Sequence, residues 1–160
     1  MDNQKVLYKK AIEILDLAQQ SLQSSMKEKF ESIVTYALHY VFGPEYSFEL
    51  EFGRRGNYQE VDLNVHTEAL EGSYDPLDTS GGGVLDIVSL ALRVAFLELY
   101  TPKIEGPIIL DESFKHLSEQ YLLSAGKFLN ILANRTKRQI IMVSHKTELI
   151  NTADNIVEIQ

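Results

Sequence analysis

The sequence contains no cysteine, and this absence excludes disulfide bonds and thiolate metal sites. It contains no apolar run long enough to span a bilayer, and the polar segment 1–10 lacks the apolar core of a secretion signal. We therefore expect a cytoplasmic protein without a membrane partner. No grouping of His, Asp and Glu has the spacing of a zinc site, and no G-x-S-x-G nucleophile elbow occurs.

Positive charge is also scarce. The chain has 15 Lys and Arg against 23 Asp and Glu, which gives a formal net charge of -8. This balance argues against a broadly basic nucleic-acid surface. A local cluster remains at Arg135, Lys137 and Arg138, and we favour the interpretation that it is a solvated helix end and loop. The 160 residues suffice for one domain with a hydrophobic core.

The G-x-x-x-x-G-K-[ST] phosphate loop is missing as well. Its absence matters because three other segments are typical of a nucleotide-hydrolysing site. Segment 80–83 (SGGG) opens a helical pattern, segment 108–112 (IILDE) is an apolar run that ends in two carboxylates, and Ser144-His145 follows a second apolar run. Together they indicate the second half of such a site.

Helical periodicity covers residues 3 to about 41, where apolar residues recur at steps of three or four. No Gly or Pro interrupts the pattern before Gly43-Pro44. About 40 helical residues would extend roughly 60 Å. The first half has polar faces and the second half is richer in large apolar groups. We expect a helix that is rooted in a domain and projects from it; an ordinary long surface helix is the alternative.

Strict alternation of apolar and polar residues then predicts a β-hairpin. The turn between its strands is expected at segment 53–57 (GRRGN), which has turn composition, and residues 67–79 are expected to form a loop. The apolar faces of the two strands consist of Tyr46, Phe48, Leu50 and Phe52, and of Val61, Leu63 and Val65.

The remaining residues alternate between helical and strand patterns, which indicates an α/β fold with parallel strand pairing. A largely buried apolar helix is expected to begin near Ser80 and to end at Thr101-Pro102. Further strands are expected at 107–111, 138–143 and 156–159, and further helices at about 118–133 and 147–152.

The two adjacent acids can serve different purposes because neighbouring side chains of a strand point in different directions. Open α/β sheets bind ligands at the carboxyl ends of their strands. Magnesium needs only one or two protein carboxylates beside substrate phosphates, and Asp111 suits this role. Glu112 could accept a proton from the water that attacks a terminal phosphate. The alternative is a solvated acid pair.

Serine is a favourable N-cap, and a glycine-led helix start offers free N–H groups to a phosphate. A flexible linker is the alternative for segment 80–83. His145 follows a strand end and could hydrogen-bond a terminal phosphate, although a lone histidine there is more often an ordinary polar residue. His39, His66 and His116 have no such context, and we treat them as structural.

The order and spacing of these segments resemble the C-terminal lobe of an ABC-type ATPase head. More narrowly, they resemble the SMC-like group that includes SbcC and related double-strand-break repair ATPases. Segment 79–83 is similar to the ABC signature loop, 108–112 to the Walker B strand and 144–145 to the H-loop, while 114–118 falls at the D-loop. The long helix resembles the returning arm of the family's coiled coil. The residues that differ from the family's usual ones are Thr79, Gly83 and Ser118.

The resemblance implies a division into residues 1–42, the stub of a coiled-coil arm, and residues 43–160, the C-terminal lobe. It implies that Asp111 holds Mg²⁺, that Glu112 is the catalytic base, and that His145 contacts the γ-phosphate of ATP. The residues implied to bind a nucleotide held by the opposing subunit are Ser80, Gly81, Gly82 and Gly83.

The implied partner is an N-terminal ATPase lobe with the missing phosphate loop, from the same parent protein or from a separate chain. Further implied partners are a second head in an ATP-dependent homodimer, a nuclease and DNA. The expected function is half of an ATPase head in DNA repair or recombination, with little activity alone. Two alternatives remain: a non-catalytic interaction module, in which a partner helix pairs with the long helix, and a fragment of a transporter's nucleotide-binding domain.

Overall fold

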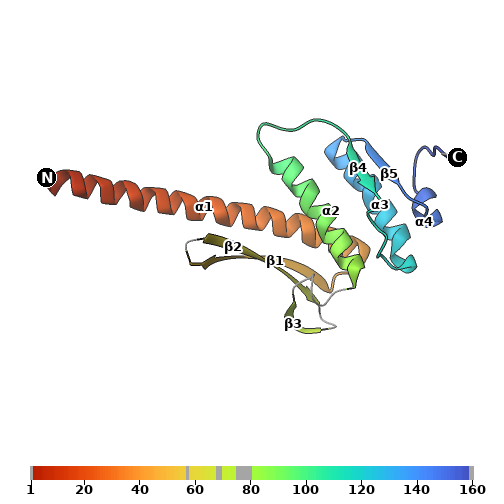
Figure 1. Ribbon diagram of the computed structural model, residues 1–160, viewed down its shortest axis with the longest axis horizontal. Coiled ribbons are helices and arrows are strands. Elements are labelled where there is room, and N and C mark those ends of the chain that lie inside the picture. The colour runs from red at the N-terminus through yellow and green to blue at the C-terminus, as the bar shows by residue number, and fades with distance from the viewer. Residues whose placement is uncertain (1, 57, 68–69, 75–80, 159–160) are drawn as a thin grey trace.

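The computed structural model describes residues 2–56, 58–67, 70–74 and 81–158. Helix α1 (Asp2–Val41) projects far beyond the other elements (Figure 1). The side chains of residues 4–22 are exposed, whereas the carboxyl-terminal part of α1 buries one face. The expectation of a rooted, projecting helix is therefore confirmed. Its buried residues are Phe30, Val34, Ala37, Leu38 and Val41.

Strands β1 (Tyr46–Arg55) and β2 (Tyr58–Thr67) form the expected antiparallel hairpin, which runs beside α1 (Figure 1). The register places Phe48 opposite Val65, as the alternation requires. The strands continue through segment 53–55, so the connection is shorter than the expected five-residue turn. Gly56 adopts φ 64°, a conformation that glycine accommodates without steric cost.

The prediction of a loop at 67–79 is wrong for residues 70–74. Strand β3 (Leu70–Tyr74) pairs antiparallel with β2, with Tyr74 opposite Val65 and an irregularity between His66 and Thr67. The sequence of β3, LEGSY, shows no clear alternation. An edge strand is held by backbone hydrogen bonds along one side, so it can form without an apolar pattern of its own. Residues 75–79 lie outside the described part of the chain.

The rest of the chain has the expected α/β alternation, and its strands β4 and β5 pair in parallel, with Asp111 opposite Val143. This parallel sheet is small, with two strands, whereas the hairpin and β3 make a three-stranded antiparallel sheet. The elements are α2 (Gly82–Leu99), β4 (Ile108–Asp111), α3 (Glu119–Thr136), β5 (Ile140–Val143) and α4 (Thr147–Ile150).

The strand expected at 156–159 does not form over its described residues, 156–158, which have no regular secondary structure. Residue 159 lies outside the described part. Ile156 and Val157 are 58% and 85% exposed. A strand needs a neighbour that satisfies its backbone groups, and no strand in the described part of the chain pairs with these residues.

The hydrophobic core lies where the root of α1 meets the hairpin, α2 and α3. Aromatic rings reinforce this junction: Phe30 meets Phe96 edge to face, with centroids 4.7 Å apart, and Phe128 of α3 packs against Tyr36 and Tyr40 of α1. The arm is therefore anchored by large apolar side chains. Among the described residues, no helix is long and apolar enough to cross a membrane.

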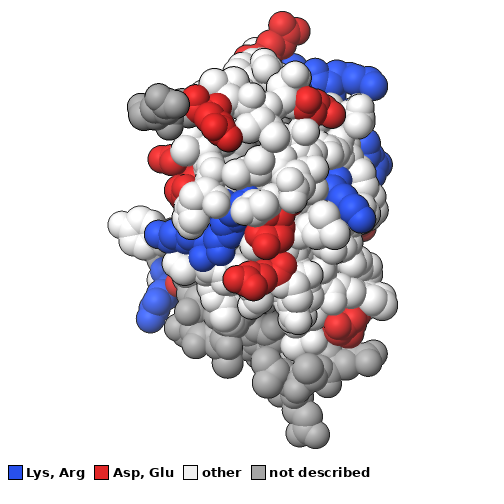
Figure 2. Space-filling view, turned by 90° about the vertical axis from the view of Figure 1, so that its right-hand side faces the viewer, with Lys and Arg blue, Asp and Glu red and all other residues white. Residues whose placement is uncertain are grey.

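Basic side chains do not gather into one patch on the face that carries α3 and α4. Figure 2 shows acidic and basic groups next to one another there, surrounded by uncharged surface. Arg138 is engaged internally, because its guanidinium donates to Glu98 Oε1 at 3.0 Å and to the carbonyl of Gly106 at 3.1 Å. Arg135 lies over the ring of Tyr36, 5.4 Å from its centroid. These contacts support a structural role for the cluster at 135–138.

Candidate functional site

Strands β4 and β5 deliver their carboxyl ends to the same place. The backbone N–H of Glu112, one residue past β4, donates to the carbonyl of Val143 at 3.1 Å. Just beyond, Nδ1 of His145 lies 3.0 Å from Oε1 of Glu112. An ionised carboxylate only accepts hydrogen bonds, so Nδ1 carries the proton of this contact and Nε2 stays available to another group. The structure thus brings Glu112 and His145 together.

Glu112 adopts an unusual backbone conformation, with φ 46°. A left-handed conformation of a non-glycine residue costs on the order of 1 kcal/mol and is concentrated at functional sites. The turn is held by its neighbours, because the carbonyl of Glu112 accepts a hydrogen bond from the N–H of Lys115 at 3.2 Å. The chain therefore holds a strained residue at the point where the carboxylate leaves the strand.

Asp111 is exposed at the last position of β4, on the same face as Ile109. No group of three or more metal-ligating side chains occurs in the described part of the chain. Magnesium binds through one or two carboxylates and completes its shell with water and phosphate oxygens. Asp111 fits a magnesium ion only in that form, as one carboxylate beside a bound phosphate.

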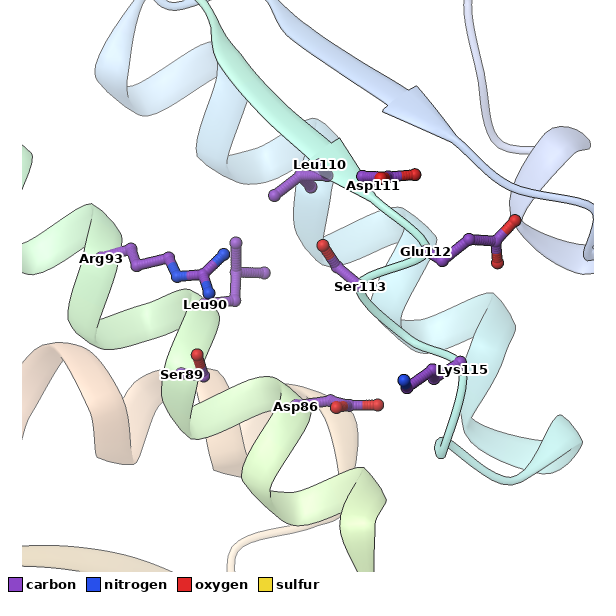
Figure 3. A pocket seen from close by; sticks show the side chains of 9 residues that line it. All are labelled: Asp86, Ser89, Leu90, Arg93, Leu110, Asp111, Glu112, Ser113 and Lys115. Atoms are coloured by element: carbon purple, nitrogen blue, oxygen red, sulfur yellow. The ribbon is translucent and has the colours of Figure 1, made fainter.

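A cavity of about 390 Å³ lies between α2 and the end of β4. Figure 3 shows Asp86, Ser89 and Arg93 on α2 facing Ser113 and Lys115 across it, while the carboxylate of Glu112 points away from α2. The cavity mixes charges of both signs with two hydroxyl groups. It is lined by Asp86, Ser89, Leu90, Arg93, Leu110, Asp111, Glu112, Ser113 and Lys115.

The glycine-led segment lies at the amino end of α2, although Ser80 falls outside the described residues. Gly81 occupies the N-cap position without a side-chain cap. A Cβ atom at Gly82 would lie 2.7 Å from Cβ of His116, and one at Gly83 would lie 3.1 Å from Cα of Leu117. A Cβ atom at Gly81 would meet no described heavy atom within 4 Å. Close packing therefore explains two glycines and leaves the surface of Gly81 open.

His116 has a more specific environment than its sequence context indicates. Its backbone N–H donates to Oδ2 of Asp86 at 3.1 Å, and its ring Nδ1 lies 3.3 Å from Oδ1 of the same carboxylate. Asp86 was not among the residues expected at the site. A signal was present, because Asp86, Ser89 and Arg93 follow the i, i+3, i+7 spacing of one face on an otherwise apolar helix.

Known proteins are similar to this chain in sequence and in fold. No protein-family model matches the chain. The chain is 34% identical over 110 residues to a DNA double-strand break repair Rad50 ATPase of Methanococcus maripaludis, which covers 64% of this chain and 11% of that protein. It is 28% identical over 150 residues to the Rad50 ATPase of Sulfurisphaera tokodaii, which covers 90% of this chain and 16% of that protein. The chain thus spans only a small part of these relatives.

The fold is similar to solved SMC head domains. One structure, described for ATP-driven dimerization and DNA-stimulated activation of SMC ATPases, has a TM-score of 0.69 at 13% identity, over 88% of this chain and 81% of that one. The Smc head of Pyrococcus furiosus, bound to the C-terminal domain of ScpA, has a TM-score of 0.61 at 15% identity, over 79% and 30%. The sequence relatives are thus Rad50 ATPases, and the fold is that of SMC head domains.

Proposed function

We propose that this chain is one half of an SMC-like ATPase head, which supplies the signature loop, Walker B strand and H-loop for ATP-dependent head dimerisation and ATP hydrolysis. The observation that carries the proposal is the Glu112–His145 contact at the adjoining tips of two parallel strands. A base and a phosphate-binding group must lie this close to act on one phosphoryl group.

In this proposal each residue at the strand tips has a separate task. Asp111 would hold Mg²⁺, which neutralises charge on the phosphates when it is bound. Glu112 accepts a proton from the water that attacks the γ-phosphate, and its contact with His145 orients both groups. Nε2 of His145 faces the terminal phosphate. The signature residues Ser80, Gly81, Gly82 and Gly83 would contact the nucleotide held by the opposing head.

An N-terminal lobe with a phosphate loop would complete the site. The outward face of β4 and β5 supports this requirement, because Ile109, Ile141 and Val143 are 69%, 44% and 55% exposed. Exposed apolar side chains side by side on paired strands indicate a surface that another element covers. Ile156 and Val157, near the C-terminal end of the chain, are also exposed and would gain a strand neighbour from that lobe.

The projecting half of α1 would pair with a second helix in a coiled-coil arm. Its exposed apolar residues support this pairing, because such a stripe has no partner within the described chain. The stripe includes Leu7, Ile14, Leu15, Leu22 and Met26.

Participation in DNA repair, with DNA and a nuclease as partners, rests on the names of the Rad50 relatives and on the family resemblance.

ATP turnover by the reconstituted head tests the proposal. The chain would be combined with the N-terminal lobe from its parent protein or neighbouring gene, and Glu112→Gln would be compared with Glu119→Gln, an exposed glutamate in the first turn of α3. We expect Glu112→Gln to abolish turnover while nucleotide-stabilised dimers persist, and Glu119→Gln to have no effect. Unchanged turnover in Glu112→Gln would favour the non-catalytic interaction module.

Binding to the isolated chain provides a second test. Most of the affinity for a nucleoside triphosphate comes from the phosphate loop and its lysine, which this sequence lacks. We expect titration calorimetry with ATP and Mg²⁺ to detect no tight binding to the chain alone. An affinity of about 1 μM, equivalent to roughly 8 kcal/mol of binding free energy, would contradict the two-lobe arrangement.

A further inference from the structure

A continuous series of contacts joins the start of α2 to the carboxylate of Glu112. At one end, Gly82 packs against His116, and Asp86 accepts two hydrogen bonds from the same histidine. At the other end, Glu112 is bonded through its N–H to Val143 and through its carboxylate to His145. Only three residues, 113–115, lie between Glu112 and His116 in the chain.

The segment between these ends has little freedom to move. Phe114 and Leu117 are buried, with 2% and 3% exposure. The N–H of Lys115 donates to the carbonyl of Glu112, and the N–H of Leu117 donates to the carbonyl of Phe114, both at 3.2 Å. A segment held by buried apolar side chains and internal hydrogen bonds transmits a displacement from one end to the other.

We propose that Asp86 is a positioning residue that fixes the glycine-led start of α2 relative to Glu112 through His116. The inference rests on the proposed function, in which Glu112 acts on the nucleotide of its own head and segment 80–83 contacts the nucleotide of the opposing head. A displacement at either nucleotide then shifts both elements. The Asp86–His116 contact therefore couples the two nucleotide sites of a dimer, although Asp86 touches neither nucleotide.

The surroundings of Asp86 suit this task. Its side chain is 15% exposed, so solvent screens its contacts less than it screens those of a surface carboxylate. Two cationic residues, Lys115 and Arg93, line the same cavity, as do Asp111 and Glu112. Ser118, where the family's D-loop usually has an aspartate, makes no side-chain cap on α3. Asp86 supplies a carboxylate from α2 to the same loop.

Nuclear magnetic resonance of the whole chain tests the coupling. In Asp86→Ala we expect hydrogen exchange to accelerate roughly tenfold at the amide of His116, which loses its acceptor, and at the amide of Val84, which donates to Gly81 within the helix start. The amide of Glu112 and the ring resonances of His145 should shift as well. Asp86→Asn retains one acceptor oxygen and should restore part of each effect.

The matched control is Ser89→Ala, on the same face of α2 and in the same cavity, which should leave all four probes unchanged. A response at His116 without any at Val84, Glu112 or His145 would overturn the proposal. If Asp86→Ala fails to fold, His116→Ala keeps the backbone bond to Asp86 and should shift Val84 and Glu112 in the same direction by less. None of these measurements needs ATP or a second lobe, so they separate failure of the coupling from failure of the ATPase proposal.

Discussion

The carboxylate of Glu31 accepts a hydrogen bond from the backbone N–H of Leu50, with 2.8 Å between Oε1 and N. One turn further along α1, Oγ1 of Thr35 accepts the N–H of Phe48 at 3.0 Å. The arm helix therefore occupies the free edge of β1 with side-chain acceptors, at the positions where another strand would offer carbonyl groups.

Replacing Glu31 by alanine should destabilise the protein because it leaves the N–H of Leu50 without its partner. An unsatisfied, partly buried donor costs about 1–3 kcal/mol, and we expect a loss in this range in urea unfolding. Glu28→Ala, at an exposed position on the same helix, is the control and should change stability little. Equal losses from the two changes would contradict the assignment of the Glu31–Leu50 bond.

The glycines of segment 81–83 should respond differently to the same substitution. Gly82→Ala places a Cβ atom 2.7 Å from Cβ of His116. We expect Gly82→Ala to lower the free energy of unfolding by about 1–3 kcal/mol, as overpacking does. Gly81→Ala meets no described atom within 4 Å and should leave stability nearly unchanged. Thermal unfolding of both variants provides the measurement, and a stable Gly82→Ala protein would show that His116 can move away.

Acid should weaken the charged contacts that join Glu49 of β1 to Lys27 of α1 and to His66 of β2. The hydrogen bond from His66 and the ion pair with Lys27 hold the pKa of Glu49 below its ordinary value of 4.5. Burial alone would lower the pKa of Lys27, yet the carboxylates of Glu31 and Glu49 raise it overall. A carboxyl group whose pKa is lowered by folding contributes stability above its unfolded pKa, and this contribution disappears as the pH falls through its folded pKa.

Stability should therefore decline below pH 4.5 more steeply in the parent protein than in Glu49→Gln, as measured by urea unfolding across that range. Glu51→Gln is the matched control, because Glu51 is an exposed glutamate on the same strand, and its profile should follow that of the parent. Parallel profiles for the parent and Glu49→Gln would show that the contacts of Glu49 with Lys27 and His66 contribute nothing to acid sensitivity.

Glycine at position 112 should stabilise the chain while removing the proposed base. Relief of the left-handed strain outweighs loss of the exposed pair with His145, so we expect Glu112→Gly to raise the free energy of unfolding by about 0.5 kcal/mol. Lys137, the C-cap of α3, has φ 58°, and Lys137→Gly should stabilise by about 1 kcal/mol.

The contrasting control is Glu148→Gly. Glu148 lies in α4, where glycine only adds backbone freedom, so this change should reduce stability by about 1 kcal/mol. Chemical denaturation of the three variants gives the measurement. A loss of stability in Glu112→Gly as large as that in Glu148→Gly would show that the backbone at 112 stores no strain.

Patterns within short segments predicted much of the fold. Alternation set the hairpin register, which pairs Phe48 with Val65, because a shift by one residue would turn its apolar face outward. Strand β3 escaped prediction because pairing with β2, rather than an apolar pattern in LEGSY, makes it a strand. Residues 156–158 carry a strand pattern, but no strand in the described part of the chain pairs with them. Strand formation depends on partners that a local pattern does not specify.

The candidate site, like the fold, could be predicted from the sequence only in part. The sequence alone determined that acids and a histidine follow two apolar strands, and parallel strands bring their carboxyl ends to one edge, so Glu112 and His145 could be expected near each other. Only the tertiary structure decided that His116 contacts Asp86, 30 residues away. Periodicity reports which face of an element is buried. The path of the loop after Glu112, fixed by the burial of Phe114 and Leu117, decides which polar groups meet across that interface.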